Sequence, residues 1–163
     1  MRKYVLTFLG MCMVLGLLSG CATSAKRAAE AAEHAQKVMT ALADRHYKIN
    51  ISHMHPLRGG SRSVSYSFSV EVKGDTLVSY LPYYGRVYWV PYGGGKGLNF
   101  TETISTYEEW EKKNGLRHVE IGLKNEEDTY LYTIEVFGNG SATIDVMARQ
   151  RDQISYSGEM EVK

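Results

Sequence analysis

The chain has 163 residues, a length that fits one domain, or one domain with short appendages. Hydrophobic residues make up 44% of it and charged residues 23%, which excludes a disordered tail, a collagen-like chain and a protein with many membrane spans. The formal net charge of +1 gives no overall basic field, so we expect no nucleic-acid partner.

The first twenty residues have the three parts of a bacterial lipoprotein signal peptide. Met1-Arg2-Lys3 is a short basic start, and residues 4–17 form an uncharged stretch too short to span a bilayer. Leu18-Ser19-Gly20-Cys21 then supplies a branched apolar residue, two small residues and a cysteine, which is the pattern of a lipobox. We predict cleavage between Gly20 and Cys21 and lipid attachment, as diacylglyceryl and palmitate chains, at Cys21. A plain signal peptide whose cysteine falls there by chance is the alternative.

Lipid attachment would also set the compartment and the cysteine chemistry. The chain has two cysteines; cleavage removes Cys12 and leaves Cys21 acylated, so we expect no disulfide, cysteine metal site or thiol catalysis. Each buried CH₂ contributes roughly 0.8 kcal/mol, so two or three acyl chains should hold the protein stably. Residue 22 is Ala and not the Asp that retains lipoproteins in the inner membrane. We expect an anchor in the outer membrane, facing the periplasm.

Residues 21–45 are predicted to form the lipidated anchor and a helix. Ser24 to Arg45 is rich in Ala, Glu, Lys and Gln, which favour helix, and its apolar residues recur with helical spacing. Val38, Met39 and Leu42 make the last turns the most apolar part, so the helix should pack on the following domain by this end and act as a spacer at its start. A partner-binding or membrane-surface helix is the alternative, although the segment lacks a bulky aromatic face.

Residues 46–163 are predicted to form a single β-barrel-like domain, because the hydrophobic period changes here from 3.6 to 2. Asn139-Gly140 is a strong hairpin signal, since a type I′ turn requires positive φ. Each strand exposes one polar face, so the apolar faces must meet in a core. We therefore expect a mainly β fold: an antiparallel meander closed as a lipocalin-like barrel or packed as a two-sheet sandwich. Strands are expected at residues 47–51, 64–73, 77–81, 86–92, 98–101, 119–124, 130–136, 142–146 and 154–162, and a short helix at 106–114.

A glycine-rich segment, Pro91 to Gly97, is the most unusual local sequence. Its backbone N–H groups could form an anion nest to which Lys96 adds charge, or it could be a turn that needs positive φ. It is not a P-loop, because Val90 and Gly97 stand where that motif requires Gly and Ser or Thr.

Aromatic residues gather just before this glycine-rich segment. Tyrosine and tryptophan suit a ligand mouth or an interface, because they join an apolar body to a polar tip; they also suit an ordinary barrel core. The candidate ligand or partner surface is Tyr83, Tyr84, Arg86, Trp89, Tyr92 and Lys96.

Catalytic and metal-binding patterns are weak. His53 and His55 lie on one face of an extended segment, but two ligands do not make a metal site. No spacing of nucleophile and base, or of paired carboxylates, supports a hydrolase. We therefore expect no enzymatic activity, no metal and no cofactor.

Several motifs taken together resemble a family of small bacterial envelope lipoproteins, known as domain of unknown function 4251. The resemblance covers the chain from about Ala25 to its end, and it implies a lipid-anchored, β-rich protein of gut-dwelling bacteria with no assigned activity and no catalytic residues to carry over. The motifs are Arg58-Gly59-Gly60-Ser61-Arg62, Gly74-Asp75-Thr76-Leu77-Val78-Ser79-Tyr80-Leu81-Pro82-Tyr83, the segment from Pro91 to Phe100, the segment from Lys124 to Tyr130, Asn139-Gly140-Ser141, and Ile154-Ser155-Tyr156-Ser157-Gly158.

Two functions remain open from the sequence. The first is a non-enzymatic, lipid-anchored module that binds a small or apolar envelope ligand at the aromatic segment. The second is a structural or assembly lipoprotein that docks on another envelope protein through a patch at Tyr83, Tyr84 and Trp89. The partners expected are thus the membrane, through the N-terminal lipid, and either a small ligand or an envelope protein.

Overall fold

The computed structural model describes residues 19–65, 67–90, 92 and 94–162. The chain divides into two units, residues 1–33 and 34–163. Helix α2 (Ser19–Ala43) contributes to both, which confirms the helix predicted from the Ala-rich composition. The predicted signal segment falls on residues 1–18, outside the described residues, and Gly20 and Cys21 lie in the first turn of α2. No helix of the described residues has the length and apolar character needed to cross a membrane.

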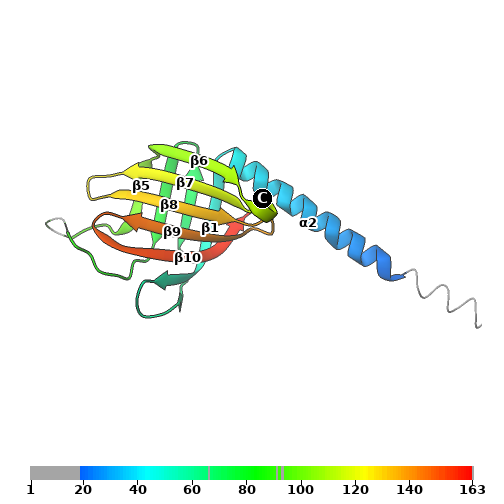
Figure 1. Cartoon of the computed structure of the whole chain (residues 1–163), viewed down its shortest axis with the longest axis horizontal. Helices are drawn as coiled ribbons and strands as arrows, with labels where there is room; N and C mark the ends of the chain where they lie inside the picture. Colours follow the sequence, from blue (N-terminus) through cyan, green and yellow to red (C-terminus); the bar gives the residue numbers. More distant parts are fainter. Residues whose placement is uncertain (1–18, 66, 91, 93, 163) are drawn as a thin grey trace, which may run out of the picture. The chain divides into compact units, whose positions relative to one another are not determined.

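The second unit is an antiparallel sheet that curls strongly into a half-barrel (Figure 1). Its hydrogen-bonded order is β5-β4-β3-β1-β10-β9-β8-β7-β6, with the short β2 paired to β1. This arrangement confirms the expected mainly β, meander-like and lipocalin-like fold. The strands are β1 (His46–Pro56), β2 (Arg62–Ser63), β3 (Ser69–Lys73), β4 (Thr76–Leu81), β5 (Leu98–Thr103), β6 (Thr106–Glu111), β7 (Arg117–Lys124), β8 (Thr129–Val136), β9 (Ser141–Ala148) and β10 (Arg151–Glu161), and a 3₁₀ turn covers Lys113–Gly115.

The first and last strands along the chain, β1 and β10, are neighbours in the sheet. β1 pairs with β10, and the order ends at β5 on one side and at β6 on the other. β5 and β6 follow each other along the chain but do not pair. The two residues between them bond elsewhere: the amide of Ile104 donates to the carbonyl of Asp75 at 2.8 Å, and that of Ser105 donates to Gly122 at 2.8 Å. The sheet therefore remains open at this corner.

The concave side of the sheet is filled by side chains that alternate along each strand. Burial alternates at every position of β8, as the period of two requires. Aliphatic side chains dominate, but Tyr132 and Tyr156 are also fully buried. The hydroxyl of Tyr132 donates to Ser79 Oγ at 2.9 Å, and Tyr156 donates to the carbonyl of Pro82 at 2.7 Å. These bonds satisfy the buried hydroxyls and link the two halves of the half-barrel through its interior.

The last turns of α2 belong to the same core. Val38 is 1% exposed and Leu42 fully buried, which confirms the prediction that the helix packs on the domain by this end. Met39, expected to share this role, is 39% exposed instead, because it lies at the edge of the stripe that Val38 and Leu42 bury. The ring of His34 also lies 3.3 Å from the carbonyl of Gly138 in the β8–β9 turn, so the helix contacts the sheet over about two turns.

Three predicted elements differ from the structure. The helix expected at 106–114 is strand β6 followed by a 3₁₀ turn, since pairing with β7 outweighs the helix propensity of its Glu and Lys residues. Of the strand expected at 86–92, the described residues 86–90 and 92 form no strand and make one bridge, Val87 to Arg151, and Pro91 lies outside the described residues. The strand expected at 64–73 pairs regularly only from Ser69 onward.

Candidate functional site

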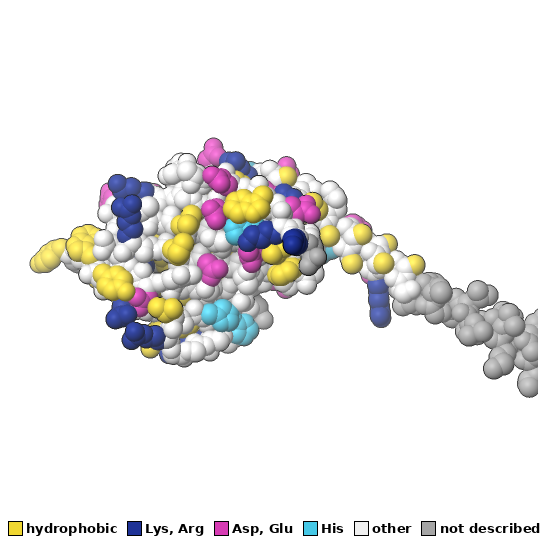
Figure 2. All heavy atoms as spheres, viewed as in Figure 1, with side chains coloured by type: hydrophobic (Ala, Val, Ile, Leu, Met, Phe, Trp, Pro, Cys, Tyr) yellow, Lys and Arg dark blue, Asp and Glu magenta, His cyan; other side chains and the backbone are white. Residues whose placement is uncertain are grey.

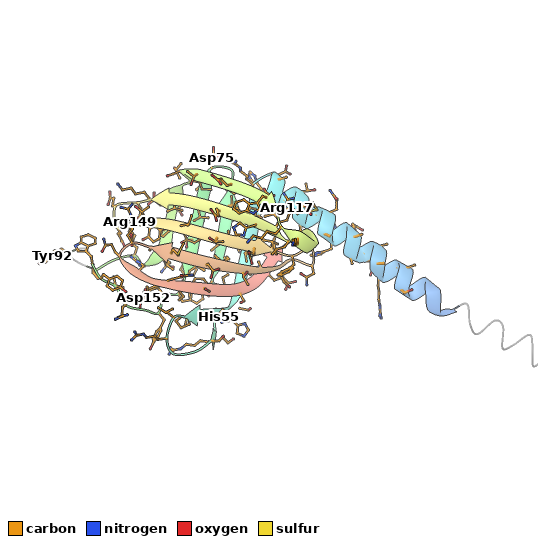
Figure 3. All side chains as sticks on the ribbon, viewed as in Figure 1. His55, Asp75, Tyr92, Arg117, Arg149 and Asp152 are labelled. Atoms are coloured by element: carbon orange, nitrogen blue, oxygen red, sulfur yellow. The ribbon has the colours of Figure 1, made fainter. Side chains whose placement is uncertain are left out.

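The loop between β4 and β5, residues 82–97, carries the predicted aromatic segment. It lies at the end of the sheet where the β7–β8 hairpin and the β9–β10 turn also lie (Figure 1). Both of these turns bind it: the amide of Tyr88 donates to the carbonyl of Gln150 at 2.7 Å, and the amide of Lys96 donates to Glu127 Oε1 at 2.8 Å. Figure 3 shows Tyr92, Arg149 and Asp152 together at this end.

Asp152 holds the first part of the loop in place. Its carboxylate is 7% exposed and accepts hydrogen bonds from the hydroxyl of Tyr88 at 2.5 Å and from the backbone N and Nε of Arg86 at 3.3 and 3.4 Å. The bond from Tyr88, followed by the bonds from Arg86, lowers the pKa of Asp152, and the same bond raises the pKa of Tyr88. Residues 86–88 are therefore held by the Asp152 carboxylate together with the single backbone bridge between Val87 and Arg151.

Acid should release this part of the loop. A lowered pKa means that the bonds to the Asp152 carboxylate are complete above the ordinary carboxyl value of about 3.9 and are lost as the pH falls through the lower folded value. In a Trp110→Phe background, where Trp89 is the remaining tryptophan, we expect the fluorescence anisotropy of Trp89 to fall at acid pH. Asp152→Asn should give the lower anisotropy already at pH 7. An unchanged acid titration in Asp152→Asn would contradict this role, with circular dichroism checking that the sheet stays folded.

A second buried charge cluster lies under the loop. The side chain of Asp128 is 1% exposed and accepts hydrogen bonds from the backbone amides of Thr129, Arg149 and Gln150 at 2.8–3.0 Å. It therefore joins the β7–β8 hairpin to the β9–β10 turn. Arg151, 5% exposed, places Nε 3.6 Å from Asp128 Oδ2 and Nη2 3.6 Å from Glu127 Oε2. Nε of Arg151 and Oε2 of Glu127 are buried without a hydrogen-bond partner in the described part of the chain.

A cavity of about 150 Å³ lies between the loop and Arg151. The hydroxyl of Tyr83 is fixed by the nearby carbonyls of Arg86 and Asp152, at 2.9 and 3.0 Å, and burial raises the pKa of this phenol. Aromatic and aliphatic side chains thus meet one buried guanidinium here. The lining residues are Tyr83, Val87, Trp89, Val90, Gly95, Gly97 and Arg151.

Beyond the cavity, the loop presents apolar side chains to solvent. Tyr88, Trp89 and Val90 are each more than half exposed, and Tyr92 is fully exposed. Figure 2 shows hydrophobic side chains at this end with Lys and Arg side chains beside them. Surfaces of exposed aromatic residues rimmed by charge are typical of interaction sites.

The predicted site residues take different positions. Tyr83 and Trp89 line the cavity, and Tyr92 extends away from it. Tyr84 lies outside the cavity lining, with the guanidinium of Arg62 4.0 Å above its ring. Lys96, which was expected to add charge to an anion nest, donates its backbone amide to Glu127, a carboxylate of the chain itself.

Sequence reasoning missed Asp128, Arg151 and Asp152, which organise the site. Each lies in or beside a turn, where charged residues are ordinary, and they have partners that are distant in the chain. The bond from Arg86 to Asp152 spans 66 residues. No local pattern in the sequence signals such a contact. The two histidines that the sequence did single out lie elsewhere: the rings of His53 and His55 stack with their centroids 6.4 Å apart, and Nε2 of His55 is hydrogen-bonded to Ser157 Oγ at 2.8 Å.

A larger groove, of about 490 Å³, lies where the last turns of α2 meet β1, β3 and β10. Charged side chains of both signs line it, and some pair with each other, as Lys73 does with Glu71 at 2.9 Å. Ligand sites are mostly apolar with a few placed polar groups. The small cavity under the β4–β5 loop fits that description better than this groove does.

Comparisons with known proteins agree with this fold. No curated protein matches the chain. A crystal structure of a DUF4251 family protein from Bacteroides eggerthii is similar, with a TM-score of 0.64 and 16% identity over 79% of this chain and 87% of that one; at this identity the likeness shows the fold alone. A family model described as Domain of unknown function (DUF4251) matches residues 29–160. The chain therefore belongs to the DUF4251 family.

Proposed function

We propose that this chain is a lipid-anchored protein of the cell envelope and a non-enzymatic binding module, with its binding site at the β4–β5 loop. The observation that carries the proposal is the cavity of about 150 Å³ beneath Trp89, walled by aromatic and aliphatic side chains. Asp152 and Glu127 hold the loop that forms it, so the cavity has a fixed shape before any ligand arrives. Preformed apolar cavities with few polar groups are the usual form of small-ligand sites.

The size of the cavity indicates what enters it. An apolar cavity of about 150 Å³ accommodates a benzene-sized molecule, whereas sites that enclose a whole drug-sized ligand measure roughly 300–1,000 Å³. The ligand would therefore insert one ring-sized apolar group. Its remaining atoms would lie over the exposed Tyr88, Trp89 and Tyr92.

The envelope anchor rests on the sequence. The lipobox at residues 18–21 supports acylation of Cys21, and Ala22 supports transfer to the outer membrane, facing the periplasm. Intact mass measurement of the protein extracted in detergent should show a chain beginning at Cys21 and carrying its acyl groups. A chain cleaved elsewhere, or without lipid, would overturn the anchor and leave the binding site to be judged by the next experiment.

A ring-sized probe tests the binding site directly. In the Trp110→Phe background, toluene should change the emission of Trp89 in a saturable way. Val87→Phe, which adds bulk to the cavity wall, should abolish that change, whereas Leu57→Phe, at a position 66% exposed and outside the lining, should leave it unaltered. No saturation up to the solubility of toluene, or an equal response in Val87→Phe, would overturn the proposal.

Docking on another envelope protein is the alternative supported by the exposure of Tyr92, which reaches into solvent beyond the cavity. Exposed aromatic residues often anchor protein interfaces. The two functions separate by substitution. Tyr92→Ser should weaken a protein complex at this surface, but it should leave toluene binding unaltered because Tyr92 does not line the cavity.

A further inference from the structure

We infer that the ligand of this cavity is a small neutral molecule that carries a carbonyl oxygen beside its ring-sized apolar group, and that Arg151 donates a hydrogen bond to that oxygen. This inference rests on the proposed binding function and deepens it. Its basis is a buried guanidinium at the wall of the cavity whose nearest acidic partners stay beyond hydrogen-bond distance.

The guanidinium of Arg151 is short of acceptors. A guanidinium has five N–H donors, and buried donors in folded proteins nearly always have partners. The side chain of Arg151 is 5% exposed, and both of its ion pairs, to Glu127 and Asp128, measure 3.6 Å. Nε lacks a hydrogen bond in the described part of the chain. The aromatic rings nearby, of Tyr83 and Tyr130, lie 5.5 and 5.8 Å from the guanidinium carbon and supply no lone pair.

The cavity gives a ligand access to this guanidinium. Arg151 lines the cavity together with Gly95 and Gly97, and Nη1 lies 3.9 Å from where a Cβ atom on Gly97 would stand. Glycine at these positions places no side chain between the guanidinium and the cavity. An oxygen atom attached to a ring that occupies the cavity can therefore approach Nη1, whereas Nε and Nη2 face Asp128 and Glu127.

The surrounding charge selects a neutral acceptor. Arg151 already faces two carboxylates, of Glu127 and Asp128, whose side chains are 14% and 1% exposed. A ligand carboxylate would bring a third negative charge into this partly desolvated cluster, where like charges repel strongly. A carbonyl oxygen of an amide, ketone or ester supplies the lone pairs without the charge.

Three probes of similar size test the assignment in the Trp110→Phe background. We expect benzamide to bind about tenfold more tightly than toluene, which corresponds to ~1.4 kcal/mol, and more tightly than benzoate. Arg151→Lys keeps the positive charge but lacks the planar fork, and it should reduce the preference for benzamide over toluene to less than about threefold. Arg149→Lys, an exposed neighbour outside the cavity lining, is the matched control and should keep the preference.

Each outcome separates this inference from the proposed function. Equal affinities for benzamide and toluene would overturn the role of Arg151 and leave the apolar site standing. Tighter binding of benzoate than of benzamide would overturn the assignment of a neutral ligand. Absence of binding by all three probes would overturn the binding site itself. Because the comparison among probes uses the native Arg151, it holds even if Arg151→Lys lowers the stability of the fold.

Discussion

Replacing Arg151 with methionine is expected to lower the free energy of unfolding by about 3–5 kcal/mol, the usual cost of removing one partner from a buried ion pair. The change would leave the carboxylates of Glu127 and Asp128 in a region where their side chains are 14% and 1% exposed. Asp128 would keep its three backbone amides, so the unpaired charge would fall mainly on Glu127. Urea unfolding, followed by circular dichroism, measures the loss.

A double-mutant cycle shows whether the loss comes from charge. Glu127→Gln removes the carboxylate that Arg151 would leave behind but keeps an oxygen for the amide of Lys96. Combined with Arg151→Met, it should therefore recover part of the stability. The double variant should lose less free energy of unfolding than the sum of the losses in the two single variants. Strict additivity would indicate that Arg151 does not act through the charge of Glu127, which leaves its ion pair with Asp128 and its contacts with Tyr83 and Tyr130.

Leu42→Ala is expected to cost about 2–5 kcal/mol, the range for truncating a fully buried leucine. Leu42 has no exposed surface, although it belongs to a helix that precedes the sheet in the chain. The substitution should leave a cavity between the last turn of α2 and the core, and the urea midpoint of the whole sheet should fall with it.

Met39→Ala is the matched control for Leu42→Ala, because Met39 lies in the same turns of the helix but is 39% exposed. We expect it to change the free energy of unfolding by less than about 1 kcal/mol, as surface substitutions usually do. A similarly small effect of Leu42→Ala would show that the helix is not part of the cooperative unit that the sheet forms.

The strands with one buried face were predictable because burial and sequence follow the same period. In β8, and in β7 from Val119 onward, buried residues alternate with more exposed ones, and the apolar pattern of the sequence therefore locates both strands to within two residues. The hairpin at Asn139-Gly140 was predictable from its glycine: Gly140 has φ +85°, which glycine adopts without strain. The turn is not the expected type I′, because Asn139 does not share the positive φ.

Edge strand β6 was not predictable, because its local sequence favours another structure. Residues 106–111 are rich in Glu, which favours helix, yet they pair with β7 over their whole length. Contacts with β7 stabilise the strand: Arg117 binds Glu109, and the ring of Trp110 lies 4.2 Å from that of His118. Tertiary pairing of this kind outweighs local propensity.

The residues of the candidate site were likewise predictable only where the signal is local. The aromatic residues could be predicted, since Tyr83 and Trp89 fall in one short segment whose composition is unusual. Arg151 and Asp152 could not, because a charge beside a turn acquires its role only when the fold brings the loop to it. Asp128 reaches amides 21 and 22 residues further along the chain, and its neighbours in the sequence give no sign of this.

The pairing of the first strand in the chain with the last determines the order in which the sheet can fold. The sheet consists of two halves, β1-β3-β4-β5 and β6 to β10, and each half pairs strands that are also close in sequence. The β1–β10 ladder joins the halves, with Gly158 packed so closely on β1 that a Cβ atom would lie 2.1 Å from the carbonyl oxygen of Asn50. Until β10 pairs with β1, the first half has an unpaired edge and an uncovered apolar face, the features that promote aggregation of incompletely folded chains. Completion of the fold therefore waits for β10, and the large sequence separation between β1 and β10 makes this step slow.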